Sequence, residues 1–373
     1  MAKSVLLFGA TGYIGAAFLS RFNNVHLVGA SPQYKVTASI RSPEKARRLK
    51  DLLPNVETTG IALGDGIKLE HEVEKCDIIV QLADCDAFDG TQSILKGMKA
   101  RKDKTGQPPR LYHASGGAFL FSEERNGYQN GTVVSDLDSE FINAIPLSKP
   151  HRDVDNSIVQ ADDAGDINSF IIVPFAVYGT GTGLLHEQIF GNQTSMPVPR
   201  LVHVSVEKGA VGQIGPGENP WMVSHVDDGL LHPTSIVVLG QRYMNLFLKL
   251  FSVAGLFMAL FEDTTRGHGK DGFYFADGDS VAAAKVFMAM AETLYSMGLS
   301  EESSPTIHTE EELKKYKIDF WGASVHVRGD RAKCTGWKAQ HGVDEFESYV
   351  ITETKRLAVQ PLDSYGRLLH YSN

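Results

Sequence analysis

The chain has 373 residues, 42% of them hydrophobic, with 36 basic and 45 acidic residues and a formal net charge of −9. This length is enough for a large buried core, and the composition is that of an ordinary globular protein. The acidic balance implies no basic face for nucleic acid, so no nucleic-acid partner is expected. Three scattered cysteines, Cys76, Cys85 and Cys334, are too few for a disulfide framework or a zinc site.

The N-terminus leads directly into an apolar run and lacks the basic region, apolar core and cleavage site of a signal peptide. Together with the sparse cysteines, this pattern favours a reducing compartment, and we expect a cytoplasmic protein. No metal site is expected, because His225 has no second histidine or carboxylate at a helical ligand spacing.

The most informative stretch lies at the N-terminus and reads KSVLLFGATGYIGAAFL. Its run VLLF predicts a buried parallel strand, and the apolar residues after the last glycine predict a helix. Between them, Gly9 permits a tight strand-to-helix turn, Gly12 lets backbone approach a pyrophosphate, and Gly15 packs helix against strand. The phosphates would lie at the helix N-terminus, whose N–H groups and dipole favour negative charge.

This GATGYIG turn resembles that of the extended and atypical short-chain dehydrogenase/reductases, a group that includes nucleotide-sugar epimerases and NmrA-like proteins. The resemblance implies an α/β fold, namely a doubly wound parallel Rossmann sheet with a smaller, interleaved C-terminal substrate domain. We expect residues 1–182 and 226–276 to form the NAD(P)-binding domain, and residues 183–225 and 277–373 to form the substrate domain.

The second predicted strand, residues 34–40, ends at Arg41 and Ser42. A carboxylate at this position would accept hydrogen bonds from the ribose 2′-OH of NAD, whereas an arginine accommodates the 2′-phosphate of NADP. The chain offers Arg41, Ser42 and Lys45 and has no carboxylate before Glu44. This chemistry favours NADP, with NAD as the alternative.

Two further strand ends are expected beside the cofactor. Residues 61–65 predict the third strand, and the resemblance implies that Asp65 meets the adenine amine, although an aspartate there also suits a turn. Residues 76–82 predict a buried strand, and the family's loop after it passes close to the adenine ribose and pyrophosphate. Ala83 is small enough for that approach, whereas the Asp84 carboxylate would have to turn away from the phosphates.

The strand predicted at residues 110–114 ends at Ser115, which resembles the family serine that hydrogen-bonds the reacting carbonyl. A serine that caps a turn is the alternative. The family's next element, a Tyr-x-x-x-Lys pair, is missing, since no tyrosine of the chain has a lysine four residues later. In the family the tyrosine transfers the proton, while the lysine lowers the tyrosine pKa and holds the nicotinamide ribose.

Two alignments place the segment 145–155 on the missing pair. If Lys149 takes the lysine position, Ile145 falls in the tyrosine position; if the apolar helix face decides, His151 takes the lysine position and Leu147 the tyrosine position. Neither supplies a phenol. We therefore expect His151 as a replacement, with a pKa lowered by the helix N-terminus so that a neutral imidazole polarises a carbonyl or relays a proton.

Residues 169–178, SFIIVPFAVY, predict a strand followed by a turn. This turn resembles the family's proline-containing turn beside the nicotinamide. Backbone groups at Pro174 would then orient the carboxamide, while Phe175 or Val177 packs on the ring. Tyr178 is the nearest phenol, although the family's tyrosines at this place are usually structural.

The family resemblance includes a strand that leads into a helix, and residues 229–252 interrupt that pattern. We therefore expect these residues to be an insertion peculiar to this chain. A membrane segment at residues 243–261 is an alternative. Lys249 lies at its centre and a turn would cross Gly255, so a surface-bound amphipathic helix is favoured over a span. No membrane partner is expected.

The predicted catalytic residues are Ser115 and His151. The predicted cofactor-binding residues are Gly9, Thr11, Gly12, Tyr13, Ile14, Gly15, Arg41, Ser42, Asp65, Ala83, Asp84, Pro174, Phe175 and Val177. This set favours an NADP-dependent oxidoreductase whose substrate is a small organic carbonyl, imine or enone. One alternative is a catalytically silent NAD(P)-binding regulator of the NmrA-like kind, which the missing tyrosine favours. The other is a nucleotide-sugar epimerase or dehydratase, which the missing tyrosine disfavours.

Overall fold

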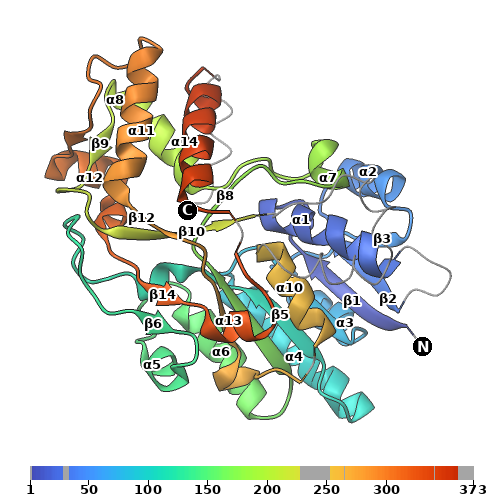
Figure 1. Ribbon diagram of the computed structural model, residues 1–373. Coiled ribbons are helices and arrows are strands. Elements are labelled where there is room, and N and C mark those ends of the chain that lie inside the picture. The colour runs from blue at the N-terminus through green and yellow to red at the C-terminus, as the bar shows by residue number, and fades with distance from the viewer. Residues whose placement is uncertain (1, 28–32, 227–252, 264, 340, 360–373) are drawn as a thin grey trace.

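The computed structural model describes residues 2–27, 33–226, 253–263, 265–339 and 341–359. Within them, the central element is a seven-stranded sheet in which every neighbouring pair runs parallel (Figure 1). In spatial order its strands are β3 (Val56–Thr59), β2 (Tyr34–Ser39), β1 (Lys3–Phe8), β4 (Ile78–Gln81), β5 (Arg110–Ala114), β7 (Asn168–Pro174) and β11 (Phe273–Ala276).

Helices cover both faces of this sheet (Figure 1). One face carries α1 (Tyr13–Phe22), α2 (Pro43–Leu52) and α10 (Val253–Glu262), and the other carries α3 (Ile67–Val73), α4 (Phe88–Thr105) and α6 (Arg152–Asp163). Strands covered on both faces are apolar along their whole length, as the run VLLF of β1 shows. The doubly wound parallel architecture predicted from the sequence is confirmed.

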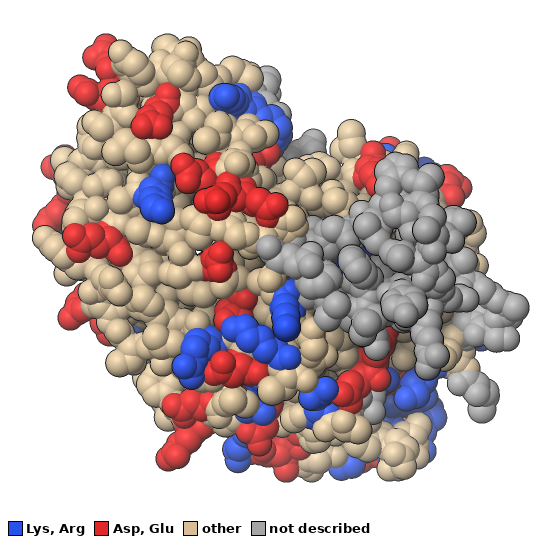
Figure 2. All heavy atoms as spheres, in the orientation of Figure 1, with Lys and Arg blue, Asp and Glu red and all other residues tan. Residues whose placement is uncertain are grey.

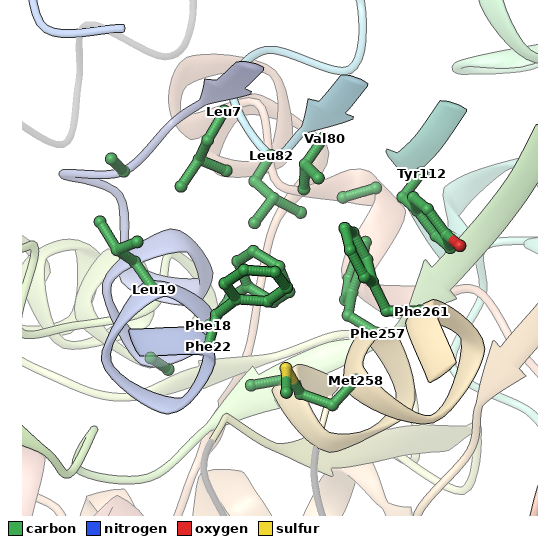
Figure 3. Packing of buried hydrophobic residues seen from close by; sticks show 14 of the residues in the cluster. Leu7, Phe18, Leu19, Phe22, Val80, Leu82, Tyr112, Phe257, Met258 and Phe261 are labelled. Atoms are coloured by element: carbon green, nitrogen blue, oxygen red, sulfur yellow. The ribbon is translucent and has the colours of Figure 1, made fainter. Parts of the chain in front are cut away.

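Aromatic rings fill the core between α1 and α10 (Figure 3). The ring centroid of Phe261 lies 4.9 Å from that of Phe22 and 4.7 Å from that of Tyr112, which projects from β5. The rings of Phe18 and Phe257 meet edge to face at 5.9 Å. Edge-to-face and stacked ring pairs of this kind add to the stabilisation from burial alone, so α10 forms one wall of the core.

A second, smaller core lies beside the sheet, in the upper part of Figure 1. It is built from three helices and a three-stranded sheet, namely α8 (Pro197–Lys208), α11 (Ala283–Ser296), α14 (Val343–Ala358), β8 (Ala176–Tyr178), β10 (Pro220–His225) and β12 (Ser280–Ala282). This lobe is the smaller C-terminal part expected from the sequence. The residue bounds of the two domains stay predictions.

Short elements connect the larger ones. They are η1 (Asn23–Leu27), η2 (Gly117–Leu120), β6 (Val134–Ser135), α5 (Ser139–Ala144), α7 (Leu184–Glu187), β9 (Gly212–Gln213), η3 (Gly269–Asp271), β13 (Thr306–Ile307), α12 (Glu310–Tyr316), η4 (Asp319–Gly322), β14 (Val327–Arg328) and α13 (Asp330–Cys334).

One predicted strand is wrong. The third strand of the sheet, β3, lies earlier than expected, and residues 61–65 form a turn. The Asp65 carboxylate accepts the backbone N–H of Ala62 over 2.8 Å, and the Ala62 carbonyl accepts the N–H of Asp65. The side chain of Asp65 thus supplies the local partner that a strand would have found in its neighbour.

The expected insertion at residues 229–252 lies outside the described residues and stays a prediction, as does most of the alternative membrane segment at 243–261. The described end of that segment, residues 253–261, makes up all of α10 except its last residue and is buried against the sheet. Across the described parts of the chain, no helix is both long enough and apolar enough to cross a membrane.

Candidate active site

The strand order reverses between β1 and β4, and the loops that follow these two strands meet at the resulting crevice. A Cβ on Gly9, whose φ is +86°, would lie 2.4 Å from the carbonyl oxygen of Leu82 at the end of β4. A Cβ on Gly15 would lie 1.9 Å from the carbonyl oxygen of Gly9. The close approach of β1, α1 and β4 therefore excludes any side chain at these two positions.

The turn between Gly9 and α1 fits a pyrophosphate. Gly12 precedes α1, and among the described residues no side chain caps this helix N-terminus. An uncapped, glycine-rich helix start is the arrangement that binds anionic ligands through backbone N–H groups. Thr11 and Ile14 are half-buried beside it. Tyr13 is buried, and its hydroxyl donates a hydrogen bond to the Gly179 carbonyl, so it anchors the loop after β8.

The residues after β2 present positive charge at the same edge of the sheet. Arg41 is exposed, and the Ser42 hydroxyl accepts the backbone N–H of Lys45 and so caps α2. Arg41 thus stands two residues before α2, whose N-terminus is the positive end of the helix dipole, and both features favour an anion.

In the loop after β4, the Asp84 carboxylate is hydrogen-bonded to the backbone of the same loop. Asp84 and Ala83 are exposed, and the Asp84 carboxylate accepts the backbone N–H of Asp86 over 3.0 Å. This bond turns the charge of Asp84 toward its own loop, as the approach of phosphates to Ala83 would require. The cofactor contacts of Ala83, Asp84 and Asp65 stay predictions.

The expected strand ends at a proline-containing turn, and a second, short strand follows it. β7 ends at Pro174, and β8 begins two residues later. The ring of Phe175 lies over Gly117, where a Cβ would come within 2.3 Å of it, and its centroid is 5.9 Å from that of Phe275. Val177 is half-buried against the α1 side of the core. These side chains form an apolar wall next to the end of β5.

Ser115 follows β5 and is buried. Its hydroxyl donates a hydrogen bond to Oδ2 of Asp155, on the first turns of α6, over 2.9 Å. Nothing of Asp155 is exposed, and its Oδ1 has no hydrogen-bond partner among the described residues. The closest ionisable side chains among the described residues are His113, with Nε2 3.8 Å from Oδ1, and Arg152, with its guanidinium 3.9 Å from Oδ2.

Burial dominates the electrostatics of this cluster. It raises the pKa of Asp155 to about 7, although Arg152 and the hydrogen bond from Ser115 act in the opposite direction. Burial also lowers the pKa of His113 to about 3. At neutral pH the His113 ring is therefore neutral, while the Asp155 carboxyl lies near its midpoint.

His151 immediately precedes α6 with a left-handed backbone, φ +66°. Its Nδ1 lies 2.6 Å from Oδ1 of Asp86 and 3.4 Å from Sγ of Cys85. A Cβ on Gly116 would lie 2.8 Å from Nε2, so the ring occupies space that glycine leaves open. The second ring nitrogen therefore lies beside the residue that follows Ser115.

The predicted lowering of the His151 pKa is wrong. Burial does lower the pKa, but the hydrogen bonds to Asp86 and Cys85 outweigh it and raise the pKa of His151 to about 10. The same pairing holds the pKa of the Asp86 carboxyl below its ordinary value. At neutral pH the imidazole is protonated, and Nε2–H is a donor.

The structure also differs from both alignments of the missing Tyr-x-x-x-Lys pair. His151 and Asp155 have the four-residue spacing of that pair and bracket the first turn of α6. Lys149 instead forms an ion pair with Glu123. The four-residue spacing was a signal by which Asp155 could have been found. Asp86 approaches from another loop, and no local pattern marks it.

Tyr178 belongs to the second core. It is buried, its ring packs against that of Phe346 at 4.8 Å, and its hydroxyl donates to the Gly342 carbonyl. Burial raises the pKa of its hydroxyl. Tyr178 therefore has a structural place in the C-terminal lobe.

A cavity of about 360 Å³ lies along the segment that joins Ser115 to His151. Most of its wall is apolar, with polar groups at one part of the rim. The lining includes Phe119, Phe121, Val134, Phe141, Lys149 and His326. A volume of this size and an apolar wall with few polar groups are typical of a small-molecule site.

No protein-family model matches the chain. The sequence is 23% identical over 373 residues to oxidase ucsJ from an Acremonium species, with 96% of this chain and 100% of that protein covered. One similar solved structure is yeast methylglyoxal/isovaleraldehyde reductase Gre2 complexed with NADPH, with a TM-score of 0.55, 14% identity, and 96% of this chain and 100% of that chain covered.

Two further solved structures are similar over nearly the whole chain. A double mutant of the dTDP-glucose 4,6-dehydratase DesIV from Streptomyces venezuelae, with NAD bound, has a TM-score of 0.58 and 15% identity, covering 98% of this chain and 99% of that chain. UDP-glucose 4-epimerase from Thermotoga maritima has a TM-score of 0.57 and 12% identity, covering 96% of this chain and 100% of that chain. The chain has the fold of the extended short-chain dehydrogenase/reductases.

In this extended short-chain dehydrogenase/reductase fold, the surface charge is mixed. Figure 2 shows basic and acidic side chains next to one another on the lower part of the visible face. Neighbouring charges of opposite sign largely cancel one another's field at a distance, and the chain as a whole has a net charge of −9.

Proposed function

We propose that this protein binds NADP(H) and transfers hydride between the nicotinamide and a small organic carbonyl, imine or enone. The observation that carries the proposal is that two polar side chains lie near the end of β5. One is Ser115, whose hydroxyl bonds Asp155, and the other is His151, whose Nε2 lies beside Gly116. Hydrogen bonds from such groups are what polarisation of a substrate carbonyl oxygen requires.

The chain's own residues fit the cofactor. The turn from Gly9 to Gly12 would hold the pyrophosphate, Arg41 and Ser42 the 2′-phosphate, and the Pro174–Phe175 turn the nicotinamide end. When bound, the nicotinamide supplies or accepts the hydride. The protein's task is then to place the substrate and to manage the proton.

His151 would hold the proton that a tyrosine holds in the related family. The Asp86 carboxylate pairs with Nδ1 of His151 and keeps the ring positively charged, so the proton available for transfer is the one on Nε2. A carboxylate that fixes one ring nitrogen of a histidine orients the other nitrogen for general acid–base chemistry. Cys85, 3.4 Å from the same Nδ1, adds a second acceptor on that edge of the ring.

The cavity supports a substrate with an apolar body. Its wall includes Lys149, two residues before His151, and Phe119, four residues after Ser115. Two residues span at most about 7 Å and four at most about 14 Å, so the wall of the cavity comes near Ser115 and His151, although neither residue lines it. We infer a substrate whose apolar part occupies the cavity and whose carbonyl lies toward Ser115 and His151.

Three similar proteins support a redox role or a nicotinamide cofactor. The curated relative carries the name oxidase, the yeast reductase structure contains NADPH, and the dehydratase structure contains NAD. Arg41, with no carboxylate before Glu44, favours NADP in this chain.

The test is turnover of NADPH across a panel of carbonyl, imine and enone substrates that vary in the size of their apolar part. We expect oxidation of NADPH by wild-type protein, a loss in His151→Ala, and full activity in the control His71→Ala, an exposed histidine of α3. If wild-type protein binds NADPH tightly but oxidises it with no substrate of the panel, the protein is instead the catalytically silent regulator.

A further inference from the structure

The Ser115 hydroxyl has a single hydrogen, and the structure points that hydrogen at Asp155. A hydroxyl that donates to a buried carboxylate can still accept a hydrogen bond, but it has nothing left to donate to a substrate. The protonation state of Asp155 therefore decides what Ser115 can do. When Asp155 is protonated, the carboxyl O–H donates to Oγ of Ser115, and the serine hydrogen is free to turn toward a substrate oxygen.

We propose that Asp155 is a positioning residue whose protonation directs the Ser115 hydrogen either into the protein or toward the substrate. The proposal deepens the proposed function and rests on it for its effect on turnover. Asp155 keeps its proton during the reaction, since the proton that reaches the product comes from Nε2 of His151. No bond to Asp155 forms or breaks other than the hydrogen bond to Ser115.

The groups around Asp155 leave its charge poorly compensated. From its own helix, the Arg152 guanidinium is 3.9 Å from Oδ2, and two of its nitrogens, Nε and Nη1, have no hydrogen-bond partner among the described residues. From β5, His113 offers a neutral ring at 3.8 Å. His151 and Asp86 act at longer range and with opposite signs. Among the described residues, the Arg152 guanidinium is therefore the nearest full positive charge to this carboxylate, and the Ser115 hydroxyl is the one side-chain donor that bonds it.

The geometry also keeps water from taking the place of Ser115. Asp155 and His113 have no exposed surface, and the Arg152 guanidinium lies over the rings of Phe119 and Phe273, 5.5 Å from each centroid. A carboxyl held in such surroundings with one donor favours the neutral form. Its titration then falls near neutral pH, where burial has raised its pKa to about 7.

Infrared difference spectroscopy tests the proposal without any substrate. A protonated carboxyl gives a C=O stretching band that an ionised carboxylate lacks. We expect such a band in wild-type protein below the Asp155 pKa of about 7, its loss above that value, and its absence in Asp155→Asn. In Ser115→Ala the band should move, because its hydrogen-bond partner is gone. No Asp155-dependent band at acid pH would overturn the proposal even if the enzyme is active.

Kinetics supply the second readout. Wild-type kcat/KM for carbonyl reduction should fall tenfold per pH unit above about pH 7, toward the level of Ser115→Ala, about 10²-fold lower. In Asp155→Asn the amide donates to Ser115 at every pH, so the profile should be flat across the neutral range at the acid-side level. The matched control is Asp153→Asn, an exposed carboxylate of the same helix, which should keep the wild-type profile. A wild-type profile in Asp155→Asn would overturn the positioning role, whereas absence of turnover in wild-type protein would count against the proposed function alone.

Discussion

Nδ1 of His151 lies 2.6 Å from a carboxylate oxygen of Asp86, while Nε2 of the same ring is the nitrogen that approaches Gly116. The two ring nitrogens therefore have different surroundings. One is tied to an anion that holds the positive charge on the ring, and the other lies at the end of β5 beside Ser115. In the proposed reaction, this arrangement would separate the group that sets the pKa of the imidazole, Asp86, from the nitrogen that delivers its proton, Nε2.

Removal of the Asp86 charge should lower the pKa of His151. The hydrogen bond and the charge of Asp86 raise that pKa to about 10, so Asp86→Asn should bring it down by at least one unit. The measurement is an NMR titration of the His151 ring protons. Asp89→Asn, an exposed carboxylate in the first turn of α4, is the control and should leave the titration unchanged. Equal pKa values in Asp86→Asn and wild-type protein would contradict the pairing.

Loss of the imidazole should slow the chemical step. His151→Ala should lower turnover roughly 10²–10⁴-fold, the range for general acid–base help, with the affinity for NADPH nearly unchanged. Steady-state kinetics and fluorescence titration of NADPH measure the two quantities separately. A variant with wild-type turnover would remove His151 from the mechanism.

The glycine turn and the sheet that carries it were predictable because their signals are local. The glycine spacing after β1 follows from steric contacts of Gly9 and Gly15 with neighbouring backbone. Apolar runs likewise marked β1, β4 and β5 near their observed places. The third strand was missed because turn chemistry at Asp65 replaced strand pairing, and a single hydrogen bond of that kind is not visible in a hydrophobic pattern.

The candidate catalytic cluster was only half predictable. Ser115 and His151 follow a strand and precede a helix, which local patterns can show. Asp86 reaches His151 across 65 residues of sequence, and this contact reverses the direction of the expected pKa shift. A helix N-terminus acts over one turn, whereas a carboxylate at 2.6 Å acts more strongly. The direction of the His151 pKa shift therefore depends on a tertiary contact that no local sequence pattern shows.

Arg41 should account for the preference of the protein for NADPH over NADH. NADPH should bind at least about tenfold more tightly than NADH, and Arg41→Ala should remove on the order of 1.5–3 kcal/mol of that preference, since one charge-assisted hydrogen bond is lost. Fluorescence titration of both cofactors gives the ratio. Arg47→Ala, exposed further along α2, should retain it. Equal affinities of wild-type protein for the two cofactors would refute the assignment.

The glycine turn should tolerate no methyl group at Gly15. A Cβ there would lie 1.9 Å from the Gly9 carbonyl oxygen, so Gly15→Ala must displace α1 from β1. We expect a loss of about 1–3 kcal/mol in the free energy of unfolding and a loss of dinucleotide binding. Gly60→Ala, where a Cβ meets no atom within 4 Å, is the matched control and should change neither. Denaturant unfolding and cofactor titration decide the outcome.

The buried pair His113 and Asp155 should have opposing effects on stability as the pH changes. The pKa of His113 is about 3 in the folded protein and near 6.5 when unfolded, so between these values the unfolded chain binds the extra proton and stability rises with pH. The pKa of Asp155 is about 7 when folded and near 3.8 when unfolded. Over that window the folded protein holds the extra proton, and stability falls as pH rises.

Single substitutions at His113 and Asp155 should therefore change the pH dependence of the free energy of unfolding in opposite directions. Each proton contributes about 1.4 kcal/mol per pH unit, so the two contributions largely cancel in wild-type protein between roughly pH 4 and 6.5. His113→Leu leaves Asp155 uncompensated, and the free energy of unfolding should fall more steeply with rising pH than in wild-type protein. Asp155→Asn leaves His113 uncompensated, and the same quantity should rise more steeply. Urea unfolding at several pH values measures both slopes. Parallel curves for the two variants would show that neither group titrates as its burial requires.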